Sequence, residues 1–203
     1  MRKLSAILLL MIGCAAPVVS LKPPSATPKA SEYVDELKRW TRHGQLQHDF
    51  EVALSVDATM MSPEFRAAYA ERVVSVYRYS EEEAARKRAE ILAEDANFFT
   101  FHLETAAHNW QTNDLSGSKS IWRISLVNDQ GREIPTTDIH SSKSAREYDI
   151  SFYPYGTEFS KPWFIRVPST FADGSPLVTA ETKTLTLRFA GPPGSIDLVW
   201  LLK

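Results

Sequence analysis

The sequence predicts an α+β protein built on an antiparallel β-sandwich, Ig-like or similar, of about seven strands. Segments in which apolar and polar residues alternate recur from Phe98 onward, as expected for half-buried strands. Sequences rich in Gly, Asn, Asp and Pro separate several of these segments, which is typical of sandwiches. Two helical segments follow the first predicted strand and one helix precedes it, so the class is α+β rather than all-β.

The first residues predict a signal peptide. Arg2 and Lys3 precede the apolar run Leu4 to Ile12, which has the charge and length of a secretory signal. A transmembrane helix needs about 20 apolar residues, so this run is too short to span a membrane. We therefore expect residues 1–13 to be removed after export.

The only cysteine of the chain, Cys14, follows this run in the stretch "LMIGCAAP". The three residues before it resemble the lipobox of bacterial lipoproteins, with Met in the place of the usual Leu. The resemblance covers residues 1–14 and implies that Cys14 is lipidated and becomes the new N-terminus. More than one acyl chain would be attached there, because stable anchoring takes at least two. Ala rather than Asp after the cysteine implies the outer membrane in the Gram-negative sorting pattern. The alternative is plain secretion, with cleavage near Ala16.

Residues 14–30 predict a tether between Cys14 and a single periplasmic domain, residues 31–203. The segment contains four prolines and few bulky apolar residues, so we expect an extended chain that could hold the domain up to about 50 Å from the bilayer. A chain with one cysteine forms no intrachain disulfide even in an oxidising compartment. The stability of the domain must then come from packing.

The first elements of the domain are a helix and a strand. Ser31 is a candidate cap for a helix in "EYVDELKRWTRHG", with Gly44 as its stop. Apolar residues then alternate with mostly polar ones from Leu46 to Val56, which predicts one half-buried strand.

Two further helices follow this strand. Ser62 and Pro63 predict a helix start, and the helix carries an apolar stripe at Phe65, Tyr69, Val73 and Val76. Ser80 and Glu83 fit a capping box that starts the next helix. The charged surface of that helix is either a partner-binding face or an ordinary solvated surface.

Six more strands complete the expected set of seven, and a short additional strand is possible around Glu133. Their ranges are 98–105, 120–129, 147–153, 161–168, 183–190 and 195–202. The last range contains "IDLVWLL", in which the final apolar residues do not alternate. This pattern predicts a central strand that is covered on both faces, with Trp200 in the core.

The sequence contains no motif of a catalytic site. His102, Glu104 and His108 share one strand parity, the arrangement that a metal site needs. Phe99, Phe101 and Leu103 hold the opposite parity and look like the core face, so we expect the polar set to point at water and to bind no metal. No serine lies in a G-x-S-x-G elbow. We therefore predict no catalytic residues and no cofactor.

An aromatic stretch, "SFYPYGTEFSKPWF", is the strongest candidate for a binding site. Strand parity assigns to the core two sets, Tyr148, Ile150, Phe152 and Trp163, Ile165, Val167. Tyr153, Tyr155 and Phe164 remain for the outer face or a loop, where exposed rings can stack on sugars or form a protein-interface hot spot. The alternative is that the helical pair packs on that face and buries them.

The charge balance argues against nucleic-acid binding. Removal of Arg2 and Lys3 with the signal lowers the 23 basic side chains to 21, against 25 acidic ones, and takes the net charge from −2 to −4. Nucleic-acid binding depends on the opposite balance. We expect an outer-membrane lipoprotein that serves as a non-enzymatic binding or structural module with an envelope protein partner. The alternatives are a carbohydrate- or peptidoglycan-binding module and a hydrolase whose site forms only in the fold.

Overall fold

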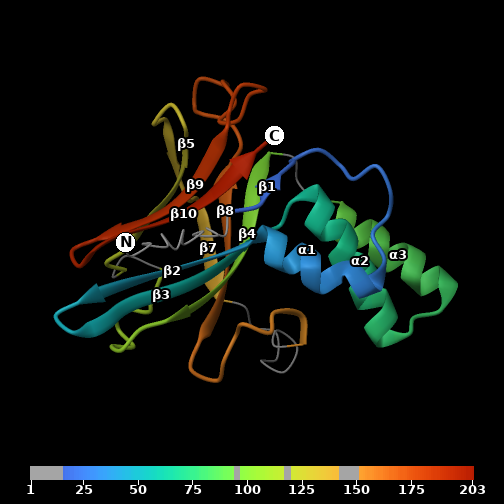
Figure 1. Ribbon diagram of the computed structural model, residues 1–203, viewed down its shortest axis with the longest axis horizontal. Coiled ribbons are helices and arrows are strands. Elements are labelled where there is room, and N and C mark those ends of the chain that lie inside the picture. The colour runs from blue at the N-terminus through green and yellow to red at the C-terminus, as the bar shows by residue number, and fades with distance from the viewer. Residues whose placement is uncertain (1–15, 94–96, 117–119, 142–150) are drawn as a thin grey trace, which may run out of the picture.

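The computed structural model describes residues 16–93, 97–116, 120–141 and 151–203, and all statements below concern these residues. Within them, ten strands form two five-stranded sheets, and three α-helices lie together on one side of the molecule (Figure 1). The strands are β1 (Val18–Val19), β2 (Thr41–His48), β3 (Glu51–Met60), β4 (Phe98–Ala106), β5 (Arg123–Asn128), β6 (Glu133–Pro135), β7 (Asp138–Ser141), β8 (Lys161–Pro168), β9 (Thr184–Gly191) and β10 (Gly194–Leu202). The helices are α1 (Tyr33–Trp40), α2 (Pro63–Tyr77) and α3 (Glu81–Leu92), and the 3-10 helix η1 (Ala30–Glu32) precedes α1. The α+β class and the sandwich-like arrangement are confirmed, whereas the expected number of seven strands and the Ig-like form of the sandwich are not.

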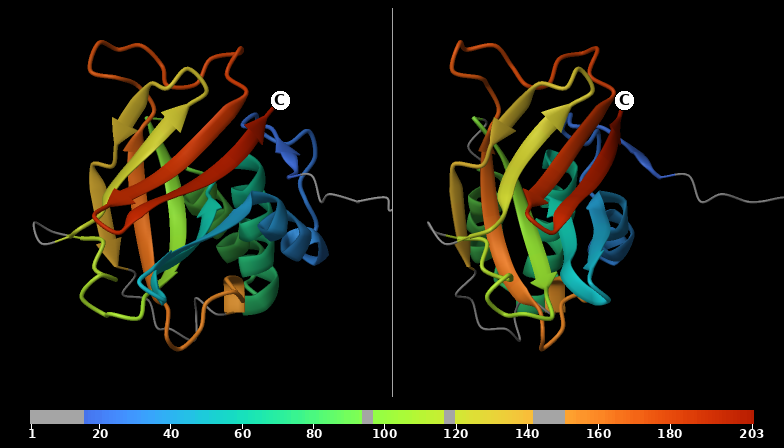
Figure 2. Two further views of the ribbon diagram at one scale, coloured as in Figure 1. Left: turned by 60° about the vertical axis from the view of Figure 1, so that its left-hand side comes forward. Right: turned by 90° about the vertical axis from the view of Figure 1, so that its left-hand side faces the viewer.

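The two sheets enclose the core between them. Sheet A has the strand order β1-β10-β9-β5-β6, and sheet B has the order β2-β3-β4-β8-β7. The helices cover the outer face of sheet B (Figures 1 and 2). Between the sheets, the ring of Trp200 on β10 lies 5.5 Å from that of Phe101 on β4, and both residues are fully buried. The expectation that Trp200 belongs to the core is confirmed.

The predicted strand from Leu46 to Val56 is a hairpin rather than one strand. Asp49 and Phe50 form its turn, with φ of 49° and 68°, as type I′ hairpin turns require. Pairing shifts from Gln47↔Val52 to Leu46↔Leu54, so that Ala53 is an extra residue on β3. Because of this extra residue, even-numbered positions such as Leu46 and Leu54 lie on the same face of both strands. The alternation in the sequence therefore continues through the turn without a break.

The start of α1 and its end also differ from the prediction. Ser31 lies within η1, and the Glu32 carboxylate accepts a hydrogen bond from the Lys29 backbone N–H at 2.8 Å. The helix ends at Trp40 and β2 begins at the next residue. Gly44 lies in β2, where an added Cβ would be 2.5 Å from Ile196 of β10. A close approach of the two sheets, rather than a helix stop, therefore explains this glycine.

The predicted starts of α2 and α3 are confirmed. Ser62 accepts a hydrogen bond from the Phe65 N–H at 3.1 Å, and Pro63 is the first helical residue. Ser80 and Glu83 form the reciprocal capping box. Phe65 and Val73 of the apolar stripe are buried, whereas Val76 is 42% exposed.

Most of the later strands agree with the prediction, and β6 is the short strand expected around Glu133. One predicted strand, 147–153, is not found in its described part, because Ser151 and Phe152 are helical. Phe152 is nevertheless buried, and Tyr148 and Ile150 lie outside the described residues. The strand β7, which was not predicted, pairs with β8 instead.

The last strand, β10, is covered on one face only. It pairs with β9 on one side and with the two-residue β1 on the other, and its residues alternate between buried and exposed. Val199 is 37% exposed. The expectation of a central strand with two covered faces was wrong, because the helices pack on sheet B and leave the outer face of sheet A open.

The described part of the predicted tether, residues 16–30, lies on the domain. Val18 and Val19 form β1 parallel to β10, and Val19 is 1% exposed. This segment is therefore not a free spacer from Val18 onward. Cys14 and the predicted signal peptide lie outside the described residues. Among the helices of the described residues, none is long and apolar enough to cross a membrane.

Candidate functional site

Two rows of polar side chains cross the outer face of sheet B. Strand register aligns Thr41, Thr59 and His102 in one row and His43, Asp57 and Glu104 in the adjacent row. We call these six residues the polar cluster. The helix α1 and the segment from Phe152 to Ser160 lie over them, so that His102 is fully buried and Glu104 is 5% exposed. The prediction that these two side chains of β4 point at water was wrong, because a distant segment covers this face.

The Glu104 carboxylate is the centre of this covered region. Its Oε2 accepts a hydrogen bond from Ser160 Oγ at 2.5 Å. Gly156 lies directly over the same carboxylate, and an added Cβ there would be 3.0 Å from Glu104 Cδ. Glycine at this position therefore allows the segment to close over the carboxylate.

His102 is held by ring contacts. Its ring stacks on Tyr153 at 3.7 Å and meets the edge of Phe164 at 5.1 Å. The distance from its Nε2 to Glu104 Oε1 is 3.4 Å, without hydrogen-bond geometry. Within the described residues, neither ring nitrogen of His102 has a hydrogen-bond partner.

The polar cluster opens to solvent at His43. The Nδ1 atom of His43 lies 3.0 Å from Asp57 Oδ1, and the His43 side chain is 57% exposed. Both residues line a cleft of about 410 Å³ between α1 and the covering segment, together with Leu37, Lys38 and Tyr155. An imidazole oriented by a carboxylate is the arrangement of a general base.

Two groups beside this cleft have shifted pKa values. Burial raises the pKa of the Asp57 carboxyl, His43 opposes this shift, and the charge of Glu104 on the neighbouring strand adds to it. Burial also raises the pKa of the Tyr155 hydroxyl, which is hydrogen-bonded to Thr59. Tyr155 is therefore a neutral hydrogen-bond donor or acceptor at pH 7.

Among the described residues, no hydroxyl or thiol group is hydrogen-bonded to the imidazole of His43. The Thr41 hydroxyl, which also lines the cleft, donates to the Leu37 carbonyl at 2.7 Å and lies 2.8 Å from Thr59 Oγ1. The cleft can therefore bind a ligand and exchange a proton with it, but it presents no activated group for covalent catalysis.

The predicted binding residues Tyr153, Tyr155 and Phe164 come together around the polar cluster. Tyr153 is 2% exposed and stacks on Tyr69 of α2 as well as on His102. Tyr155 and Phe164 are half-buried. For Tyr153 the alternative interpretation is correct, because the helices bury its ring. This ring therefore does not provide an open surface.

The metal arrangement considered for β4 does not form. His108 lies near Glu51, with 3.5 Å between Nε2 and Oε1, and its side chain is 66% exposed. It is thus outside the covered region that holds His102 and Glu104. Among the described residues there is no group of three or more His, Cys, Asp or Glu that could hold a metal ion.

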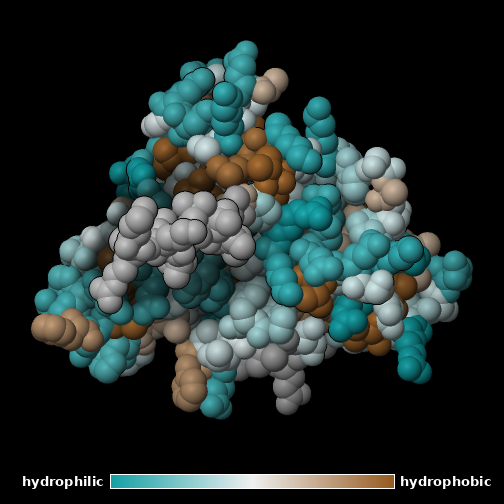
Figure 3. Space-filling model, viewed as in Figure 1, coloured by the Kyte–Doolittle hydropathy of each residue, from teal (hydrophilic) through white to brown (hydrophobic). Residues whose placement is uncertain are grey.

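Three exposed aromatic residues were missed by the sequence analysis. Phe50 is 108% exposed, Trp110 is 80% exposed and Phe159 is 79% exposed. Phe50 follows β2, Trp110 follows β4 and Phe159 precedes β8. Strand register places these three positions at the same end of sheet B. We call these residues the aromatic end. In Figure 3, apolar atoms protrude at the tip of the β2–β3 hairpin and at the turn before β8.

Two hollows lie at the aromatic end. One, of about 620 Å³, is lined by Phe50 and Phe159 together with Gln45, Glu51 and His108. The other, of about 550 Å³, is lined by Trp110 and by the polar residues Asn109, Gln111, Thr112 and Asp114. The consecutive residues His108 and Asn109 connect them. No strong sequence signal marked Phe50 as a turn residue, because type I′ turns prefer Asn-Gly or Asp-Gly and this one is formed by Asp49 and Phe50.

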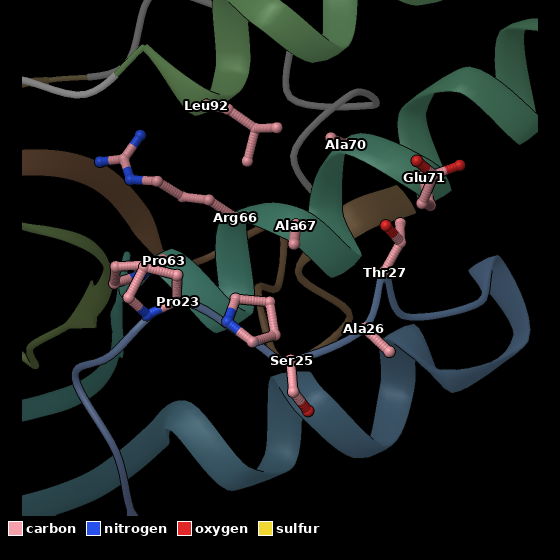
Figure 4. Close-up of a pocket in the computed structure, with 11 residues that line it drawn as sticks. Pro23, Ser25, Ala26, Thr27, Pro63, Arg66, Ala67, Ala70, Glu71 and Leu92 are labelled. Atoms are coloured by element: carbon pink, nitrogen blue, oxygen red, sulfur yellow. The ribbon is translucent and has the colours of Figure 1, made fainter.

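A further pocket, of about 580 Å³, lies under the N-terminal segment (Figure 4). Pro23 to Thr27 form one wall, and Pro63, Ala67 and Ala70 of α2 form the other. The small alanine side chains leave the space between the segment and the helix. This pocket shows that the proline-rich segment lies along α2.

Comparisons with known proteins do not identify a family. No protein-family model and no curated protein matches this chain. A crystal structure of a novel protein of unknown function from Burkholderia pseudomallei K96243 is similar at 12% sequence identity, with a TM-score of 0.44, over 83% of this chain and 80% of that one.

Proposed function

We propose that this protein is a lipid-anchored, non-enzymatic binding module of the bacterial cell envelope. It is anchored in the outer membrane through Cys14 and binds an envelope protein in the periplasm with its aromatic end. The observation that carries the proposal is the exposure of Phe50, Trp110 and Phe159 at one end of sheet B. Single exposed apolar residues are ordinary, but these three come from three separate segments and two of them line one hollow.

A protein partner fits the chemistry of this end. Trp is among the residues most enriched at interface hot spots, and Phe is enriched at interface cores, because aromatic rings bring a large rigid area at a low entropy cost. The surrounding side chains are polar, which corresponds to the rim of an interface.

Two experiments test this proposal. Cys14→Ser should abolish labelling with a radioactive or clickable palmitate and leave an unprocessed precursor, because a hydroxyl accepts the lipid far less readily than a thiol. A triple variant, Phe50→Ala with Trp110→Ala and Phe159→Ala, should lose the partner that the parent captures by crosslinking in intact cells. The control is Val76→Ala with Leu92→Ala, two residues that are 42% and 49% exposed on the helices. Mature soluble protein of unchanged size from Cys14→Ser would contradict anchoring, and capture by the triple variant would contradict the binding surface.

A carbohydrate, such as the glycan strands of peptidoglycan, is the second candidate ligand. The observation in its favour is that amide side chains flank the exposed rings, since Asn109 and Gln111 adjoin Trp110 and Gln45 lines the hollow with Phe50. Purified peptidoglycan should then sediment the parent protein but not Trp110→Ala. Sedimentation without any effect of this substitution would count against the aromatic end as the glycan site.

A hydrolase is the third candidate, and only the oriented His43 favours it. Its test is turnover of activated esters and glycosides by the parent and by His43→Ala. Turnover that disappears in His43→Ala, with unchanged melting temperature, would replace the binding proposal for the cleft.

A further inference from the structure

The chain is fixed to the domain very soon after Cys14. Val18 and Val19 pair in parallel with Leu201 and Leu202 of β10, and the Lys203 N–H donates to the Val19 carbonyl at 3.0 Å. Val19 is 1% exposed, whereas Val18 is 49% exposed. The side chain of Val19 therefore points into the core and holds this short strand in place.

The length of chain before β1 limits how far the domain can be from its anchor. Four residue steps separate Cys14 from Val18, and an extended chain covers at most about 3.6 Å per residue. Chain length therefore limits the distance between the Cα atoms of Cys14 and Val18 to roughly 15 Å. This is far less than the roughly 50 Å that a free tether would allow.

The surface beside β1 has the chemistry of a face that rests on a phospholipid bilayer. Val18 and Val199, both exposed, lie on one face of sheet A because Val18 pairs with Leu201. Three basic residues adjoin them along the chain or through a hydrogen bond. Lys22 follows β1, Lys203 follows β10, and the Arg42 guanidinium donates to the Val199 carbonyl at 2.7 Å. Basic residues beside a small apolar area are attracted to anionic headgroups.

We propose that β1 seats the lipid-anchored domain directly on the membrane, with the face formed by Val18, Lys22, Arg42, Val199 and Lys203 against the phospholipid headgroups. This inference rests on the proposed lipidation of Cys14. We call this face the membrane-proximal face.

The same geometry sets the direction of the aromatic end. β10 and β2 run past each other, since Val199 meets Arg42 at one end and Gly194 lies beside Leu46 at the other. The turn at Phe50 is thus at the opposite end of β2 from β1, about 25 Å away at 3.3 Å per residue. Figure 2 shows β1 beside the C-terminal end of β10, with the β2–β3 turn far from it. A domain seated in this way presents the aromatic end to the periplasm.

The test measures how far two points of the lipidated full-length protein lie from a bilayer. Cys14 is the only cysteine and is blocked by its lipid, so an introduced cysteine accepts a single dye. Lys183→Cys places the dye beside β10, where the Lys183 carbonyl accepts from Leu202, and Glu51→Cys places it at the aromatic end. Energy transfer is measured to headgroup dyes in vesicles of phosphatidylethanolamine and phosphatidylglycerol.

Matched variants connect the result to β1. In the parent and in Val76→Asp, the same substitution at an exposed valine of α2 outside the membrane-proximal face, we expect clearly stronger transfer from position 183 than from position 51. In Val19→Asp, which buries a charge and releases β1, the two efficiencies should become similar. A Gly-Ser spacer of eight residues inserted between Ala16 and Pro17 should also make them similar, and it leaves β1 and its contacts intact if Val19→Asp fails to fold.

Equal transfer from the two positions in the parent would overturn the inference, and so would an unchanged contrast in the spacer variant. Hydrogen exchange of the Lys203 amide in full-length Cys14→Ser tests the docking of β1 without the lipid. Slow exchange in this protein and fast exchange once Val19→Asp is added would support docking. If the Lys203 amide exchanges slowly in Cys14→Ser but the wild-type protein does not float with the vesicles, β1 is docked and the lipid anchor is absent. This result would overturn the lipid anchor, and with it the membrane-proximal face. Fast exchange in Cys14→Ser alone would overturn the docking itself.

Discussion

Replacement of Trp200 by alanine should remove a contact that joins the two sheets and the end of α1. Trp200 is fully buried, its ring lies 5.5 Å from that of Phe101, and its Nε1–H donates to the Trp40 carbonyl at 2.9 Å. Truncation of a large core aromatic residue to alanine costs about 3–5 kcal/mol. The loss of the donor to a buried carbonyl adds about 1–3 kcal/mol.

These costs are a large fraction of the total stability, which is about 5–15 kcal/mol for a typical domain. Since about 1 kcal/mol shifts the melting temperature of a domain of this size by 2–4 °C, Trp200→Ala should melt at least about 10 °C below the parent or be insoluble. Circular dichroism during heating and in urea measures both effects. Trp200→Phe retains most of the apolar area but loses the donor, so it should cost about 1–3 kcal/mol.

Trp110→Ala is the matched control, because the same substitution is made where the side chain is 80% exposed. It should change the free energy of unfolding by no more than about 0.5 kcal/mol. The reasoning would be refuted if Trp200→Ala melted within a few degrees of the parent, or if Trp110→Ala lost as much stability as Trp200→Ala.

Three other substitutions test separate features of the fold. In Gly44→Val, the added Cβ alone would be 2.5 Å from Ile196 and 2.7 Å from Leu198, so overpacking should cost about 1–3 kcal/mol or more. An unchanged urea midpoint would show that β2 and β10 do not approach this closely. Ser62→Ala removes the cap that accepts from the Phe65 N–H and should cost about 1 kcal/mol. The control Ser75→Ala, at an exposed serine in the last turn of the same helix, should cost almost nothing in the same urea titration. Asp57→Asn removes a carboxylate whose folded-state pKa is raised, chiefly by burial. Such a group favours folding at low pH and loses that contribution as the pH rises through its folded pKa. The variant should therefore be more stable than the parent at pH 7. This advantage should shrink as the pH falls through the raised folded pKa of Asp57 and should be gone below the ordinary pKa of aspartate. An advantage that grows towards acid in melting curves would contradict the assignment.

The covered face of β4 illustrates which part of the candidate site could be predicted. Phe101 and Leu103 were recognised as core residues because alternation identifies one buried face of a strand. The burial of His102 and Glu104 on the other face depends on Tyr153, Gly156 and Ser160, which are some fifty residues away in the sequence. Alternation within β4 carries no information about a segment that the fold brings over it.

The exposed aromatic residues show the opposite error. In the sequence, Phe50 continues the alternation from Leu46 to Val56 and therefore resembles a core residue. In the structure it occupies a turn with positive φ, and the extra residue Ala53 restores the parity that the turn would otherwise have reversed. A pattern with a period of two cannot distinguish this hairpin from one strand.

The sequence by itself determined the features that depend on residues a few positions apart. The caps at Ser62 and Ser80, the α+β class and most of the later strands follow from local hydrogen bonds and hydrophobic periodicity. The tertiary structure alone decided which second faces are covered, where β1 docks, and that Phe50, Trp110 and Phe159 meet at one end of sheet B. The physical reason is that burial and sheet pairing are energies of long-range contact. Val19 is held by Leu202 because the two strands meet in space, and nothing in the proline-rich segment around Val19 marks it as a strand.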